Sequence, residues 1–228
     1  MQRFLKLMGW VAAVLLVALP VVAQVPPDAA QIARYQGLHA AAQRGDLAGL
    51  TTLIAARADL NARDTVGRTP LHVATFARQR EMIRALAKAG ADLSALENDR
   101  YDAVTIAADD EETLRLLLSL GAGASLVTSR YDGTALIAAA HLGHDAVVRQ
   151  LIRAGAPLDH VNNLHWTALI ESIVLGDGGV RHVACLRALL AAGADTRLTD
   201  REGRSPLALA QSREFSEMAR YLTEAGAR

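Results

Sequence analysis

The sequence predicts an all-α solenoid of about six helix-turn-helix repeats joined by β-hairpin-like loops. The first observation is a near-constant period: an apolar residue near the start of a short Ala-rich segment recurs at intervals of 33, 33, 32, 33 and 38 residues. These residues are Leu38, Leu71, Val104, Leu136, Leu169 and Leu207. The second observation is a Gly-Ala pair in register with them, beginning at Gly90, Gly121, Gly155, Gly193 and Gly226. Such a period is typical of stacked repeats, in which each unit buries its apolar side against its neighbours.

The first 23 residues differ in character from the rest of the chain. Arg3 and Lys6 precede an apolar run from Leu7 to Leu19, and small residues follow up to Ala23. This pattern is typical of a secretory signal peptide, so residues 1–23 are expected to be removed by cleavage after Ala23. A retained membrane anchor is the alternative, but the run is short for a span of about 20 residues. We therefore expect a periplasmic or extracellular protein with no membrane span after cleavage.

The charge balance argues against one class of partner. Residues 1–23 hold two basic and no acidic residues, so cleavage would leave 22 Lys and Arg against 24 Asp and Glu. Binding to nucleic-acid phosphates needs clustered Lys and Arg, and DNA and RNA are therefore not expected as partners. Cys185 is the one cysteine and cannot form an internal disulfide, so the fold must depend on packing.

The elements are expected in a simple order along the chain. Residues 24–34 should form a polar linker and the start of an N-terminal helix, and residues 35–228 the repeat domain. The repeats are predicted at about 35–64, 65–97, 98–129, 130–162, 163–200 and 201–228. These units leave no room for a separate catalytic domain.

Each repeat carries the signals of two helices. A hydroxyl residue stands where the first helix needs an N-cap in four copies, at Thr69, Thr134, Thr167 and Ser205. Pro70 and Pro206 follow at the first helical position, where the missing N–H costs nothing. The second helix has apolar residues at helical spacing, and the glycine of the Gly-Ala pair is expected to end it in a left-handed turn. Gln36 replaces the capping residue in the first copy.

The clearest copy reads Gly67-Arg68-Thr69-Pro70-Leu71-His72-Val73-Ala74. It resembles an ankyrin repeat, whose signature is T-P-L-H-x-A in a unit of about 33 residues. The resemblance extends over residues 36–227, with the most diverged copy at 102–107. It implies a scaffold that binds another protein through its hairpin tips and the concave face of its first helices, and the pattern of residues 1–23 predicts that this scaffold is exported. It also implies a structural, locally hydrogen-bonded role for His39 and His72.

Carried onto this sequence, the resemblance places the partner-binding residues on the hairpins of the third to fifth repeats. They are Arg100, Tyr101, Arg130, Tyr131, Asn162, Asn163, His165 and Trp166. Tyr, Trp and Arg are the side chains most often found at binding hot spots, and three of the chain's nine aromatic residues stand here. For Trp166, packing over the helix start is an equal alternative. The partner is expected to be another protein, such as a periplasmic stress enzyme or a toxin, bound by a monomer.

The hairpins of the middle repeats depart from the pattern. The position filled by Gly67 and Gly203 holds a larger residue in three copies, at Arg100, Asp132 and His165. Glycine adopts positive φ at little cost, whereas other residues do so less readily. Of the three, Asp132 tolerates this conformation best, and Gly133 is the alternative in the fourth repeat because this hairpin is one residue longer. Drift within a redundant array is preferred to hairpins reshaped for a partner.

Two further departures change the length of a repeat. The third repeat is two residues shorter between its helices and carries Asp109-Asp110-Glu111-Glu112. Because acidic residues are favourable at a helix start, a solvated first turn is preferred to a docking patch for a basic partner.

The fifth repeat has five extra residues around 177–181. They lack the pattern of a phosphate-binding loop, so a flexible insertion is preferred to a partner-contact loop.

No cofactor, metal site or catalytic group is expected. Five of the seven histidines lie between His141 and His182, but His144 and His182 share a repeat position. Packed helices would hold them roughly 8–10 Å apart, too far to share an ion with ligands at about 2 Å. No catalytic motif is present, and Cys185 falls on a buried helix face, so an enzyme is not expected. The alternative is a small-molecule or metal receptor, or an unrecognised enzyme, that uses the histidine-rich fourth and fifth repeats and the inserted loop.

Overall fold

The computed structural model describes residues 24–227, and the predicted signal peptide lies outside this range. After a short helix α1 (Ala29–Arg34), the described residues form six helix pairs. The inner helices, next to the hairpins, are α2 (Gly37–Arg44), α4 (Pro70–Phe76), α6 (Ala103–Ile106), α8 (Ala135–Leu142), α10 (Ala168–Val174) and α12 (Pro206–Ser212). The outer helices are α3 (Leu47–Ala55), α5 (Arg80–Lys88), α7 (Glu111–Ser119), α9 (Asp145–Arg153), α11 (Val180–Ala191) and α13 (Ser216–Glu224).

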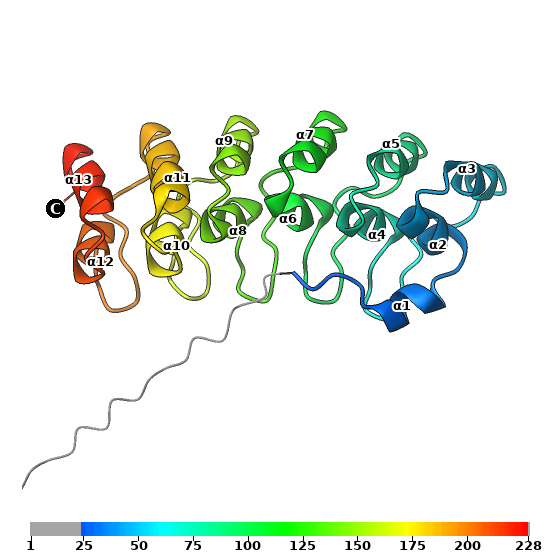
Figure 1. The fold of residues 1–228 in the computed structure, drawn as a ribbon, viewed down its shortest axis with the longest axis horizontal. Helices are drawn as coiled ribbons and strands as arrows, with labels where there is room; N and C mark the ends of the chain where they lie inside the picture. The colour runs from blue at the N-terminus through cyan, green and yellow to red at the C-terminus, as the bar shows by residue number, and fades with distance from the viewer. Residues whose placement is uncertain (1–23, 228) are drawn as a thin grey trace, which may run out of the picture.

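The pairs stack side by side in two rows, with the hairpins projecting from the inner row (Figure 1). Within residues 24–227 the hairpins contain no regular strand and a single antiparallel bridge, between Thr128 and Gly133. The predicted all-α solenoid is therefore confirmed. In the same range, no helix is long and apolar enough to cross a membrane.

The inner helices begin as the capping residues predict. The side chain of Thr69 accepts a hydrogen bond from the backbone of His72, and Thr134, Thr167 and Ser205 do the same three residues on. Gln36 makes no such bond, as expected. The outer helices of the second to sixth repeats are followed by glycines with positive φ, of which Gly90 at 96° is representative. Each cap satisfies backbone groups that the helix itself leaves without partners.

The core lies between the two rows and runs through the whole array. Leu71, Leu136 and Leu169 from the periodic position are at most 1% exposed. Fully buried Ala74 and Ala139 allow neighbouring inner helices to approach closely. Because each repeat buries its apolar side against the next, the array behaves as a nearest-neighbour stack. The last repeat meets water, with exposed side chains at Glu217, Arg220 and Glu224 on α13 and at Arg213 and Glu214 in the turn before it.

The hairpins tolerate non-glycine residues at the predicted position. Arg100, Asp132 and His165 have φ of 67°, 52° and 63°. The fourth hairpin is one residue longer than its neighbours: Thr128 donates to the carbonyl oxygen of Gly133, five positions on, whereas Asn162 donates to that of Trp166, four positions on. The alternative at Gly133 is wrong, since Gly133 is not among the residues with positive φ. Asp132 and Ser129, at 64°, adopt that conformation instead.

Both length changes alter the turn between inner and outer helix. In the third repeat α6 is continued by a 3-10 turn, Ala107–Asp109, and Asp110 alone separates it from α7. In the fifth repeat the pair α10–α11 spans residues 168–191, or 24 residues, against 19 for residues 135–153 of α8–α9. The five extra residues therefore lengthen both the turn and the outer helix.

Candidate functional site

The predicted aromatic residues line one cavity on the inner side of the solenoid. Tyr101, Tyr131 and Trp166 come from three successive hairpins and border a cavity of about 340 Å³. Tyr101 is only 9% exposed, whereas Tyr131 and Trp166 are half-buried. Burial raises the pKa of Tyr101 to about 12, so its hydroxyl stays protonated. We call the surface made by the hairpins and the exposed sides of the inner helices the hairpin groove.

The predicted arginines are engaged with neighbouring hairpins. Arg100 Nη1 lies 2.7 Å from Asp132 Oδ1, and Arg130 pairs with Asp99. Asp99 raises the pKa of Arg130 above its usual range. Both pairs are about half exposed, so each contributes little stability. They join consecutive hairpins, and a partner that used either arginine would compete with these contacts.

The predicted asparagines and histidine have separate roles. Asn162 is 5% exposed, and its Oδ1 accepts hydrogen bonds from the backbone N–H groups of Leu164 and Trp166 at 3.0 and 2.9 Å. Asn163 is exposed and donates from Nδ2 to the carbonyl oxygen of Arg130. His165 is exposed at the hairpin turn. Asn162 therefore shapes the hairpin, and His165 is the more accessible side chain.

The hairpin role of Asn162 recurs along the chain and was missed by sequence reasoning. Asp64 Oδ1 accepts from the N–H groups of Val66 and Arg68, and Asp200 Oδ1 accepts from those of Glu202 and Arg204. The signal was a polar residue five positions before each N-cap. Such side chains mimic a backbone turn, as Asp and Asn commonly do.

The cavity extends from the hairpins to the inner helices of the third to fifth repeats. Thr105 of α6, Ile137 and Ala138 of α8, and Glu171 of α10 belong to its lining. The full lining comprises Tyr101, Thr105, Thr128, Ser129, Tyr131, Gly133, Thr134, Ile137, Ala138, His141, Asn162, Leu164, Trp166, Glu171 and Leu175. It contains no lysine or arginine. This combination of apolar walls and a few polar groups is typical of binding sites.

Glu171 is the most unusual residue of the cavity. It is 6% exposed, and its Oε1 lies 3.3 Å from His141 Nδ1. Its Oε2 is buried and has no hydrogen-bond partner among the described residues. Sequence reasoning missed it, although its position is apolar in every other copy: Ala40, Val73, Ile106, Ala138 and Leu209. A carboxylate here is costly unless something pairs with it.

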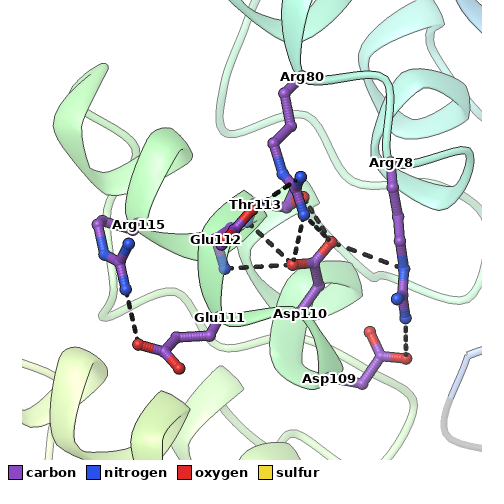
Figure 2. Close-up of polar contacts among 8 residues, drawn as sticks. All are labelled: Arg78, Arg80, Asp109, Asp110, Glu111, Glu112, Thr113 and Arg115. Carbon is purple, nitrogen blue, oxygen red and sulfur yellow. Dashed lines mark hydrogen bonds and ion pairs between the residues drawn. The ribbon is translucent and has the colours of Figure 1, made fainter.

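The acidic run of the third repeat pairs with arginines, as Figure 2 shows. Asp110 is buried, caps α7 by accepting from the backbone of Thr113, and lies 3.0 Å from Arg80 Nη2. The exposed carboxylates are also paired: Asp109 with Arg78, Glu111 with Arg115 and Glu112 with Arg80. The first turn is therefore solvated except at Asp110. Its charges are matched locally, which argues against a docking patch for a basic partner.

The inserted loop is packed against the last repeat. A Cβ at Gly178 would lie 2.5 Å from Cδ1 of Phe215, and Arg213 Nη2 donates to the carbonyl oxygen of Gly176 at 3.1 Å. Asp177 Oδ1 lies 2.8 Å from His182 Nδ1. These contacts hold the loop in place, which differs from the expected flexible insertion.

The histidines are dispersed among backbone contacts. His182 Nε2 lies 2.9 Å from the carbonyl oxygen of His141, and His160 Nε2 lies 2.6 Å from that of Asp132. Burial lowers the pKa of His144. Among residues 24–227, no three His, Cys, Asp or Glu side chains are grouped so as to hold a metal ion.

His72 and Cys185 are buried, and His39 is half-buried. His72 is 1% exposed, with Nδ1 against Thr69 and Nε2 near the carbonyl oxygens of Ala95 and Tyr101. His39 contacts the carbonyl oxygen of Arg68. Cys185 is fully buried, and burial raises the pKa of its thiol to about 12. The thiolate is the reactive form of cysteine, and this buried thiol stays protonated. Cys185 therefore serves to fill the core.

Comparison with known proteins agrees with this architecture. Three copies of the ankyrin repeats family profile match residues 38–128, 109–200 and 136–228. The protein YahD of Escherichia coli (strain K12) is 36% identical over 190 residues, which cover 82% of this chain and 94% of YahD. The chain therefore belongs to the ankyrin repeat family.

Solved structures show the same fold. An ankyrin repeat domain from Acinetobacter baumannii AYE superposes with a TM-score of 0.79 at 40% identity, over 84% of this chain and 98% of that one. A chain from the complex of the predatory endopeptidase Bd0816 of Bdellovibrio bacteriovorus with immunity protein Bd3460 superposes with a TM-score of 0.66 at 24% identity, over 83% and 98%. The second likeness shows the fold alone.

Proposed function

We propose that this protein is an exported ankyrin-repeat scaffold that binds another protein through the hairpin groove of its third to fifth repeats and has no catalytic activity of its own. The observation that carries the proposal is the cavity of about 340 Å³ bordered by Tyr131 and Trp166. Large aromatic side chains at a depression are typical binding hot spots. Ankyrin repeat proteins bind other proteins, so the fold and the surface support the same function.

The proposal of export rests on the pattern of residues 1–23. The protein is expected in the periplasm or outside the cell, with Gln24 as its first residue. N-terminal sequencing of the protein recovered from an osmotic-shock fraction tests this directly. A chain that still begins at Met1 and stays with the spheroplasts would contradict export.

The partner we propose is another exported protein, such as a stress enzyme or a toxin, bound by a monomer of this chain. The Bdellovibrio structure supports this kind of partner, because it contains an endopeptidase in complex with an immunity protein and one of its chains shares the fold of this protein. That likeness does not extend to the identity of the partner here.

Affinity capture tests the protein-binding function. The bait is the purified protein, and the matched variant carries Tyr131→Ala and Trp166→Ala, both half-buried at the cavity. Tyr101 is left in place because it is buried. We expect one protein from the osmotic-shock fraction to be retained by the parent and lost by the variant, which must keep the parental circular dichroism. Equal retention by both would move the site away from the groove, and no specific retention would contradict protein binding.

The alternative function is a small-molecule receptor that uses the same cavity, whose volume of about 340 Å³ lies in the range of ligand pockets. A small molecule that co-purifies with the protein and is released by the Tyr131/Trp166 variant would favour this alternative.

A further inference from the structure

An extended segment of the chain itself already occupies part of the hairpin groove. Residues 24–28 run across the hairpins of the second and third repeats before α1 begins (Figure 1). Gln24 Nε2 donates to the carbonyl oxygen of Thr105, and Arg68 Nη2 donates to that of Val25 at 2.7 Å. The groove therefore accommodates an extended polypeptide and binds it through backbone carbonyl groups.

The cavity continues this occupied part of the groove. Tyr101 borders both a depression that Val25 and Pro26 help to line and the cavity of the third to fifth repeats. Thr105 accepts the hydrogen bond from Gln24 and also lines the cavity. The cavity therefore lies beyond the Gln24 end of this segment, and once the proposed cleavage after Ala23 has occurred a second extended segment can follow the same path there. This continuity favours a polypeptide occupant over a free small molecule.

The charge of the cavity selects the side chain that such a segment would insert. Glu171 is buried, and its Oε2 has no hydrogen-bond partner among the described residues. No lysine or arginine lines the cavity, and Ile137 and Ala138 add apolar surface. A guanidinium or ammonium group supplies both the missing donor and the opposite charge. Tyr131 and Trp166 at the same cavity are the aromatic surfaces on which such a cation packs favourably.

We propose that the cavity between Tyr131, Trp166 and Glu171 is the anchor site for an arginine or lysine side chain on an extended segment of the partner protein. The inference rests on the proposed protein-binding function and adds the chemistry that the partner must present. The buried carboxylate is then a binding group that the scaffold maintains at a cost to its own stability.

Short peptides test the anchor site without knowledge of the partner. The probes are acetylated and amidated pentapeptides, Ala-Ala-Arg-Ala-Ala and the same peptide with glutamine in the centre. Binding is followed by the indole N–H signal of Trp166 in proton–nitrogen NMR spectra, assigned with a Trp166→Phe variant. We expect the arginine peptide to shift this signal and the glutamine peptide to bind at least tenfold more weakly.

Two variants make the test specific to Glu171. Glu171→Gln keeps the shape and an acceptor for His141, and it should weaken the arginine peptide at least tenfold. Glu81→Gln removes one charge from an exposed position on α5 and should leave binding unchanged. Glu171→Gln should also melt at the parental temperature or above, because it removes a buried carboxylate whose Oε2 has no partner among the described residues and keeps the contact of Oε1 with His141, whereas a purely structural role would lower the melting temperature.

The outcomes separate this proposal from the function on which it rests. Equal binding of the two peptides, or an unchanged affinity in Glu171→Gln, would overturn the anchor site even if affinity capture still retains a partner. Free arginine amide that binds as tightly as the peptide would also overturn it and favour a small-molecule site. Failure of affinity capture, with the peptide result intact, would instead contradict the protein-binding function.

Discussion

Replacement of Asp110 by alanine is expected to destabilise the protein by about 2–3 kcal/mol. The lost N-cap of α7 accounts for about 1 kcal/mol. The fully buried Thr113 donates from Oγ1 to Asp110 Oδ2 at 2.6 Å, and loss of this acceptor would cost about 1 kcal/mol. The ion pair with Arg80, whose side chain is 39% exposed, adds only about 0.5 kcal/mol because solvent screens it.

Urea unfolding followed by circular dichroism measures this free energy. Asp110→Asn keeps an oxygen for the cap and should cost about 1 kcal/mol or less, and Glu111→Ala, which removes an exposed pair with Arg115, should cost below about 0.5 kcal/mol.

Burial opposes ionisation of Asp110, but hydrogen bonds from Thr113 and the charge of Arg80 outweigh it and lower its pKa below 3.8. Its ionisation therefore stabilises the fold above pH 3.8, and this contribution is lost as pH falls through the lowered pKa. An Asp110→Asn variant as unstable as Asp110→Ala would refute the capping argument.

Three further predictions concern buried positions. Burial lowers the pKa of His72 from 6.5 to about 4, so as pH falls the unfolded chain binds a proton before the folded chain does. The free energy of unfolding should therefore fall by about 3 kcal/mol as pH drops from 6.5 to 4. His72→Gln should show a flatter pH profile in urea titrations, and parallel profiles of the two proteins would contradict the role of His72. Gly178→Ala should destabilise by about 1–2 kcal/mol, because φ is 71° and the new Cβ meets the Phe215 ring, while Gly179→Ala should cost less; equal thermal shifts would count against the packed loop. Cys185 should react with a thiol reagent only after unfolding, and rapid reaction of the native protein would show that it is accessible.

The fold was largely predictable because its signals are local and repeated. N-cap residues such as Thr69, the Gly-Ala pair and the apolar period each act within one repeat, and their agreement across copies made the architecture clear. The positive φ of Asp132 rather than Gly133 was less predictable. It depends on which residues pair across a single hairpin.

The candidate site was only partly predictable, because its contacts join different repeats. Tyr131 and Trp166 were identified from residue type, and both line the cavity. Arg100 and its partner Asp132 are 32 positions apart in the sequence, and Arg130 and its partner Asp99 are 31 positions apart. Both separations are close to one repeat period, so the period indicated that these residues lie on neighbouring hairpins. Glu171 was not predicted, because hot-spot residue types point to the hairpins, whereas this carboxylate stands out only against the apolar residues at the same helix position of the other copies.

Site-specific photocrosslinking in cells tests the central claim most directly. A photoreactive amino acid is placed at Tyr131 in the hairpin groove and, as the control, at exposed Arg84 on the outer helix α5. The account predicts a covalent adduct with one other protein from position 131 and none from position 84. An adduct from position 84 alone, or none from either position, would contradict protein binding through the hairpin groove.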